Sequence, residues 1–195
     1  MLKKYSYCFL LLSINILLLT NHTYAENFIK QTQIDGTIRS YYFSRFYNNP
    51  IIYNQNAYSL GGNLNILTGT ILPGLQAGAT LYTAQPLGLN SDKKKQVDNT
   101  LPGFPVTVLG QSYLQYRNNF ALIKVGNQII NTPWLNAADS RIIPATYQGL
   151  YGLFNLWQNL KITALRVWSF KGRTADYFSQ TNLYNPINIG GTVIP

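Results

Sequence analysis

A small set of basic side chains has the type and spacing for recognising an anion. Arg39 and Arg45 fall on the same face of an alternating segment, Ile38 to Tyr47. Guanidinium groups carry forked donors that match the two oxygens of a carboxylate. We therefore predict a carboxylate-binding surface on that face. Tyr41 lies between the two arginines on the same face, and Arg117 and Lys124 of other segments could extend the basic lining.

A second candidate is the polar triplet Asp139-Ser140-Arg141, within the stretch "NTPWLNAADSRIIP" from Asn131 to Pro144. An acid and a base stand beside a serine, which raises the question of catalysis. Neither neighbour can replace the histidine that shuttles protons in a serine nucleophile site. The triplet alone does not predict an enzyme.

The N-terminus removes most other catalytic chemistry. Two lysines, an apolar run and the ending Thr23-Tyr24-Ala25 are typical of a secretory signal peptide over residues 1–25. The apolar run is shorter than the roughly 20 residues needed to span a bilayer. Cleavage after Ala25 would remove the only cysteine, Cys8, and the only histidine, His22. The mature chain then has no disulfide, no thiolate and no histidine ligand for zinc.

Charge and composition narrow the classes further. After Ala25 the chain carries thirteen basic and six acidic residues, a net charge of +7. A basic surface can bind nucleic acid. A chain exported by a signal peptide leaves the compartment that contains nucleic acid, which argues against this partner. Paired carboxylates for glycoside hydrolysis would need two of only six acids to converge. We predict no enzyme, no cofactor, no metal site and no nucleic-acid partner.

The elements that must position these residues alternate like strands. In "YSLGGNLNILT" (58–68), Leu60, Leu64 and Ile66 share one face, while Asn63 and Asn65 share the other. Similar runs predict seven strands, with a possible eighth from Tyr177 onward. Three connections are tight and the others are long (48–56, 85–105, the opening stretch, and the region after Lys171).

Two architectures fit such strands. A soluble sandwich would bury its apolar face, whereas a transmembrane barrel would turn it to lipid and line a wet lumen with the polar face. The signal peptide and the alternating loop lengths favour an all-β, antiparallel up-and-down transmembrane barrel. Aromatic residues near strand ends agree, because membrane interfaces prefer them: Tyr41, Tyr42, Phe46, Tyr47, Tyr58, Tyr82 and Tyr116.

Several segments resemble the OprD-type outer-membrane porins. "AYSLGGNLNILTG", "LPGLQAGATLYTAQPLG" and "LGQSYLQYR" are similar to the first hairpins of that family, and "VGNQIINTPWLNAADSRIIPATYQG" to the strand and loop that follow. The last match is the most specific. The resemblance runs from about Gly36 to Tyr184.

The resemblance implies a porin in the bacterial outer membrane that lets small, carboxylate-bearing solutes diffuse past basic residues. Such barrels have roughly 18 strands and enclose an aqueous channel. Residues 26–195 supply seven or eight, so we expect the N-terminal part of a porin domain: a fragment, a truncated product or one piece of a split gene. A self-sufficient small barrel, or an adhesin that binds ligands through its loops without conducting, is the alternative.

The implied partners are outer-membrane lipid, small solutes, and the periplasmic chaperone and barrel-assembly machinery; the oligomeric state is left open. The stretch from Asn131 corresponds in the family to the loop folded into the channel. Asp139 and Arg141 would either pin this loop or face the solute, and pinning is favoured. The remaining constriction-loop residues are predicted to be Pro133, which stiffens it, Trp134, which anchors it with Leu135, and Ser140.

Overall fold

The computed structural model describes residues 28–157 and 160–180. They form one antiparallel sheet of seven strands, arranged in the order of the chain. The predicted signal peptide and the tail beyond Gln180 lie outside the described residues. The strands are β1 (Gln33–Arg45), β2 (Gln55–Leu67), β3 (Leu75–Gln85), β4 (Val106–Arg117), β5 (Ala121–Gln128), β6 (Thr146–Trp157) and β7 (Leu160–Lys171).

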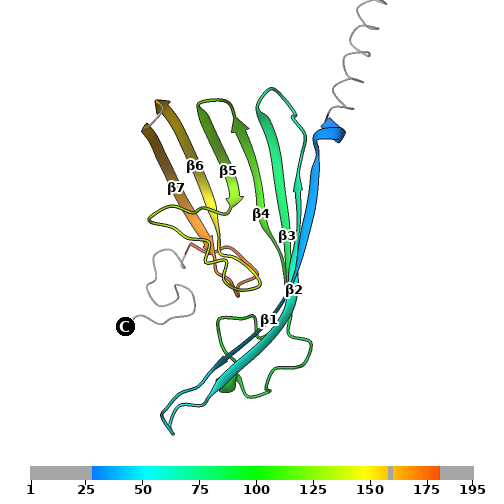
Figure 1. Cartoon of the computed structure of the whole chain (residues 1–195), viewed down its shortest axis with the longest axis vertical. Coiled ribbons are helices and arrows are strands. Elements are labelled where there is room, and N and C mark those ends of the chain that lie inside the picture. The colour runs from blue at the N-terminus through cyan, green and yellow to red at the C-terminus, as the bar shows by residue number, and fades with distance from the viewer. Residues whose placement is uncertain (1–27, 158–159, 181–195) are drawn as a thin grey trace, which may run out of the picture.

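The sheet curves into a half-barrel, with short turns at one end and long loops at the other (Figure 1). Every strand pairs with its sequence neighbour, as the up-and-down prediction requires. The β3–β4 loop carries one short helical turn, η1 (Lys94–Gln96). Register shifts in the β3–β4 and β6–β7 pairs mark bulges, which locally increase bend and twist.

The two faces of the sheet differ as the alternation predicts. We call the inner face the one covered by the β5–β6 loop, and the outer face the opposite one. Ile38, Leu64 and Leu81 of β1 to β3 point outward and are exposed. The outer face therefore presents an apolar surface suited to lipid.

Two of the tyrosines assigned to the membrane interface lie elsewhere. Tyr82 is only 3% exposed and belongs to an apolar cluster on the inner face, and Tyr41 packs against that cluster. Strand alternation places Tyr41 of β1 and Tyr82 of β3 on the polar, inner face of the sheet. The long loops that fold onto this face cover them. By contrast, Tyr42 and Phe46 point outward and are exposed, as predicted.

The buried apolar residues lie where long loops fold onto the inner face. One cluster joins Ala57, Tyr82 and Ala84 of the wall to Leu101 of the β3–β4 loop and Ile142 of the β5–β6 loop. A second joins Ile130 and Ala145 to Tyr147 and Phe170. The buried core of the described residues thus lies between the long loops and the inner face of the sheet.

The segment after β7 turns back toward it. Ser179 forms an antiparallel bridge with Phe170, through backbone hydrogen bonds of 3.2 and 2.9 Å. This bridge lies where an eighth strand was predicted to begin; the rest of that prediction falls outside the described residues. Among the described residues no helix is long and apolar enough to cross a membrane.

Candidate functional site

The β5–β6 loop, residues 129–145, is seated on the inner face by apolar contacts. Ile142 and Ile143 are completely buried in the cluster with β2 and β3. A glycine in the wall makes room for this contact: a Cβ on Gly61 would lie 2.7 Å from Cγ2 of Ile142. The close approach of loop and wall therefore depends on a missing side chain.

The loop is also held by its own hydrogen bonds. Asn131 Oδ1 accepts a bond from the backbone of Ala137 (2.9 Å), and Ala145 donates to the carbonyl of Ala137 (2.6 Å). The hydroxyl of Tyr147 donates to the carbonyl of Asn136 at 2.8 Å. Side chains satisfy the backbone here as a ladder does in a strand, so the loop has a defined shape.

Arg39 of β1 makes a two-pronged ion pair with the loop. Its Nη1 and Nη2 donate to the two oxygens of Asp139 at 2.5 and 3.1 Å, and Nη1 also donates to the carbonyl of Arg141 at 3.0 Å. Both side chains stay partly accessible, at 33% and 43%. The carboxylate of Asp35, the other acid near this arginine in the sequence, accepts a hydrogen bond from the side-chain amide of Asn65.

Arg141 reaches from the loop to the same strand. Its Nη1 donates to the hydroxyl of Tyr41 at 2.9 Å, and its guanidinium lies 4.4 Å from the ring centroid of Phe43. Its Nε donates to Thr100 of the β3–β4 loop at 3.1 Å. Asp139 and Arg141 are thus held by β1 and not by each other.

A buried acid joins this group to the second arginine of β1. Asp98 is fully buried, and Nη2 of Arg45 lies 3.2 Å from its Oδ2, an ion pair without hydrogen-bond alignment. The other oxygen of Asp98 accepts from the Thr100 hydroxyl. A continuous chain of contacts therefore runs from Arg45 through Asp98 and Thr100 to Arg141.

Two cations after the loop complete the group. Lys171, at the end of β7, is fully buried, and its Nζ donates to the carbonyls of Pro144 (3.3 Å) and Gly172 (3.0 Å). Arg173 donates to the hydroxyl of Ser140 at 3.4 Å. Burial, with a contribution from nearby Arg141, lowers the pKa of Arg173.

The predicted anchor of the loop is wrong. Trp134 is 73% exposed and packs against nothing in the buried clusters, although Leu135 does pack against one of them. Pro133 is exposed in the same turn, where the Thr132 hydroxyl accepts from the backbone of Trp134 and Leu135. The isoleucines near the other end of the loop anchor it instead.

Lys124 and Arg117 form a separate group. Both lie on the inner face, as predicted, but nearer the short turns, away from the loop. Nζ of Lys124 lies 4.4 Å from the ring centroid of Tyr113, a cation–π contact. The predicted basic surface is therefore two clusters separated along the wall.

The β3–β4 loop lines an open pocket of about 690 Å³ at the long-loop end. Its lining includes Val97, Leu101 and Phe104 together with Asp98 and Lys94. Within the described ranges no three His, Cys, Asp or Glu residues are grouped so that they could hold a metal ion.

Sequence reasoning missed the residues that support the arginines. Asp98 and Thr100 stand in a polar loop with no period to single them out, and Lys171 ends a strand as many surface lysines do. One pattern could have found Ile142 and Ile143: two adjacent isoleucines between charged and proline residues are unusual in a solvated loop.

Comparisons with known proteins agree with this geometry. Residues 26–187 match the family model described as outer membrane porin, OprD family. No match is found among curated protein sequences. Solved structures that match include three Pseudomonas porins: a BenF-like porin from Pseudomonas fluorescens Pf-5, OccK9 (OpdG) from Pseudomonas aeruginosa, and OpdK from the same species, determined with vanillate.

These structures share the fold at low sequence identity. The BenF-like porin superposes with a TM-score of 0.65 at 18% identity over 77% of this chain and 40% of its own. OccK9 gives 0.67 at 19%, covering 78% and 42%, and OpdK gives 0.64 at 18%, covering 78% and 40%. The chain thus spans about two fifths of the length of these porins.

The family match covers nearly all of the strands and loops described above. Seven antiparallel strands with an apolar outer face, long loops at one end and one loop folded onto the inner face are the corresponding part of a porin barrel. OprD-family porins reside in the bacterial outer membrane, and this chain is placed there with them. The chain belongs to the OprD family of outer membrane porins.

Proposed function

We propose that this chain forms part of the wall and the constriction of a channel that passes small, carboxylate-bearing solutes. The observation that carries the proposal is the convergence of cations where the β5–β6 loop meets the inner face. Five basic side chains, Arg39, Arg45, Arg141, Lys171 and Arg173, surround two acids, Asp98 and Asp139.

The excess of positive charge would attract an anion without trapping it. Conduction requires a site that binds strongly enough for entry and weakly enough for release. Arg39 is engaged by Asp139 yet remains 33% accessible. A solute carboxylate would therefore compete with Asp139 for forked donors, which weakens binding relative to a free arginine.

The loop contributes the narrowing. Its buried isoleucines and its ion pair with β1 hold residues 129–145 against the wall. Asp139 and Arg141 would then serve mainly to pin the loop, while the accessible edges of Arg39 and Arg173 meet the solute. The Tyr41 hydroxyl, which accepts a hydrogen bond from Arg141, would orient Arg141, and the Ser140 hydroxyl, which accepts from Arg173, would orient Arg173.

The second basic group would act at the other end of the wall. Lys124 and Arg117 lie nearer the short turns, which face the periplasm in outer-membrane barrels. A solute leaving the constriction would pass them next. Their separation from Arg39 gives two successive anion sites, an arrangement that favours transfer over capture.

The matched structures support the two parts of this proposal, namely that the protein is a channel and that its solutes carry a carboxylate. All are porins, and one was determined with vanillate, which is a carboxylate. We extend channel activity, rather than enzymatic activity, from those proteins to this one. A second candidate function is an external loop that binds a ligand without conducting. The observation in its favour is the pocket lined by the β3–β4 loop.

A liposome-swelling assay with the purified protein tests the proposal. Benzoate should enter faster than benzyl alcohol, which has nearly the same size and no charge. Changing Arg39 and Arg173 to Gln should remove that preference, while the same change at Arg166, on the outer face, should leave it intact. Equal rates for the two solutes would reject carboxylate selectivity, and no swelling would favour the non-conducting candidate.

A further inference from the structure

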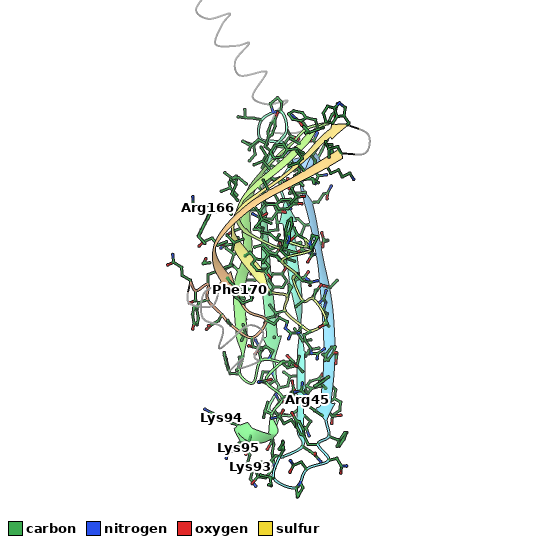
Figure 2. The ribbon with its side chains drawn as sticks, turned by 90° about the vertical axis from the view of Figure 1, so that its left-hand side faces the viewer. Arg45, Lys93, Lys94, Lys95, Arg166 and Phe170 are labelled. Atoms are coloured by element: carbon green, nitrogen blue, oxygen red, sulfur yellow. The ribbon has the colours of Figure 1, made fainter. Side chains whose placement is uncertain are left out.

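One cation of the described strands lies on the outer face of the sheet. Arg166 is in the middle of β7, directly opposite Leu150 of β6, and its side chain is exposed. Ile162 and Trp168 share its outward parity and are exposed too. Figure 2 shows the Arg166 side chain projecting away from the ribbon. The residue thus interrupts an apolar surface.

Such a position is costly for a charge. An arginine on the lipid face of an outer-membrane barrel costs about 2–4 kcal/mol at the bilayer midplane and about 0–1 kcal/mol near the interface. An ionisable group facing hydrocarbon therefore needs a partner or a route to the headgroups. The charge alone makes Arg166 a candidate site.

In the part of the chain that the structure describes, no protein group supplies that partner. Within residues 28–157 and 160–180, the ion pairs made by arginine are those of Arg39 and Arg45, and no hydrogen bond from the Arg166 side chain is found. The sequence from Tyr177 to Pro195 contains no aspartate or glutamate.

Beyond Arg166, toward the long loops, the outer face carries Trp168 and then a polar pair. Gln148 and Ser169 are opposite each other in the register, and the serine hydroxyl donates to Gln148 Oε1 at 2.7 Å. A few residues further on, β6 begins at Thr146 and β7 ends at Lys171. The long loops lie at this end of the strands, which is the extracellular end in outer-membrane barrels. The long arginine side chain can reach the headgroup level from here.

We propose that Arg166 binds the phosphate group of an outer-leaflet lipid whose acyl chains lie along the outer face of β6 and β7. A guanidinium matches a phosphate with two parallel hydrogen bonds. Leu150 and Ile162 supply the apolar surface for the acyl chains, and Trp168 is the amphipathic ring typical of the interface. The site is separate from the channel and does not depend on which solute passes.

Native mass spectrometry of the full chain, extracted from outer membranes, tests this site. The probe is lipid A, a phosphorylated glycolipid, added at matched concentration with the same lipid stripped of phosphate. Wild-type protein should retain lipid A about fivefold more than Arg166→Leu, as expected for one cation at an anionic surface. Arg166→Lys should retain an intermediate amount of lipid A. The lipid stripped of phosphate should bind equally to wild type and to Arg166→Leu.

A matched control shows whether the charge or the location matters. Lys161→Leu removes a cation from the same strand, but from the inner face, and should retain lipid A like wild type. Arg166→Leu removes a charge from an apolar surface and should fold at least as well, which heat-modifiable mobility on a gel can verify.

Four results would overturn the assignment. Retention of lipid A could be the same in wild type and Arg166→Leu, or wild type could hold the phosphorylated and stripped lipids equally. Cross-linking could instead give a protein complex that depends on Arg166, with no difference in lipid. Displacement by equimolar inorganic phosphate would also reject a lipid site in favour of a simple anion site.

Discussion

At the scale of single residues, the contact between Arg39 and Asp139 would connect the proposed selectivity to the position of the β5–β6 loop. Two parallel hydrogen bonds fix one carboxylate on the wall, and the same guanidinium holds the carbonyl of Arg141. Arg39 therefore holds the loop and remains 33% accessible, so in the proposed channel the free edge of its guanidinium would face the lumen. The two roles proposed for the triplet need not exclude each other.

Changing Asp139 to Asn separates these roles. The amide keeps the size of the side chain but loses the charge-assisted pair, which contributes about 1 kcal/mol when partly exposed. We expect noisier single-channel current and faster proteolysis within residues 129–145. Asp92→Asn, in the β3–β4 loop, is the charge-matched control and should behave as wild type. A change in solute preference with quiet current would contradict pinning.

The isoleucine contact is a second residue-scale test. Replacing the fully buried Ile142 with Ala should lower the free energy of unfolding by about 2–4 kcal/mol, because it leaves a cavity between loop and wall. Denaturant unfolding followed by tryptophan fluorescence measures the change. Phe104→Ala, in the neighbouring long loop, removes a larger but exposed ring. It should cost less than about 0.5 kcal/mol; equal costs would mean that Ile142 is not the anchor.

At the scale of elements, two long loops act on the inner face together. The β3–β4 loop supplies Asp98 and Thr100, and the β5–β6 loop supplies Arg141. Because Thr100 donates to Asp98 and accepts from Arg141, the position of one loop depends on the other. The β3–β4 loop is thus a brace for the constriction.

A double-mutant cycle measures this coupling. Thr100→Val and Arg141→Gln should show an interaction energy of about 0.5–2 kcal/mol in unfolding, as groups in direct contact do. Thr100→Ser keeps the hydroxyl and should restore most of the coupling. Strictly additive effects of Thr100→Val and Arg141→Gln would show that the loops are independent.

The same elements show how far sequence reasoning could go. Alternation at a period of two predicted the seven strands and put Leu64 and Asn63 on opposite faces, because strand geometry is local. It did not predict the inward burial of Tyr82 or the exposure of Trp134, since these depend on which loop folds over which strand. The triplet was recognised from its residues, but the pairing of Asp139 with Arg39 joins positions 100 residues apart.

At the scale of the whole molecule, the sheet separates a lipid surface from a polar one. Leu64 and Asn63 of β2 are adjacent in sequence and face opposite sides. Leu64→Lys should lower the free energy of unfolding in lipid vesicles by about 2–4 kcal/mol, whereas Asn63→Lys should cost less than about 1 kcal/mol. Similar costs for both, measured by urea unfolding, would contradict the assignment of the faces.

In the proposed channel, the distribution of charge on the inner face would determine which solutes the whole molecule selects. Its basic side chains lie in two groups, one at the seated loop and one near Lys124, with two buried or paired acids between the arginines of the first group. In the proposed channel this arrangement would give a positive lumen surface without an isolated binding charge. The channel account therefore predicts anion selectivity that depends on the arginines at the loop.

The zero-current potential across a planar bilayer under a salt gradient tests this most directly. The purified protein should form open steps with an anion-selective potential, and Arg39→Gln with Arg173→Gln should shift that potential toward cations. Arg166→Gln, on the outer face, should leave it unchanged. A cation-selective potential in the unmodified protein, or one that the inner-face changes leave untouched, would contradict the account.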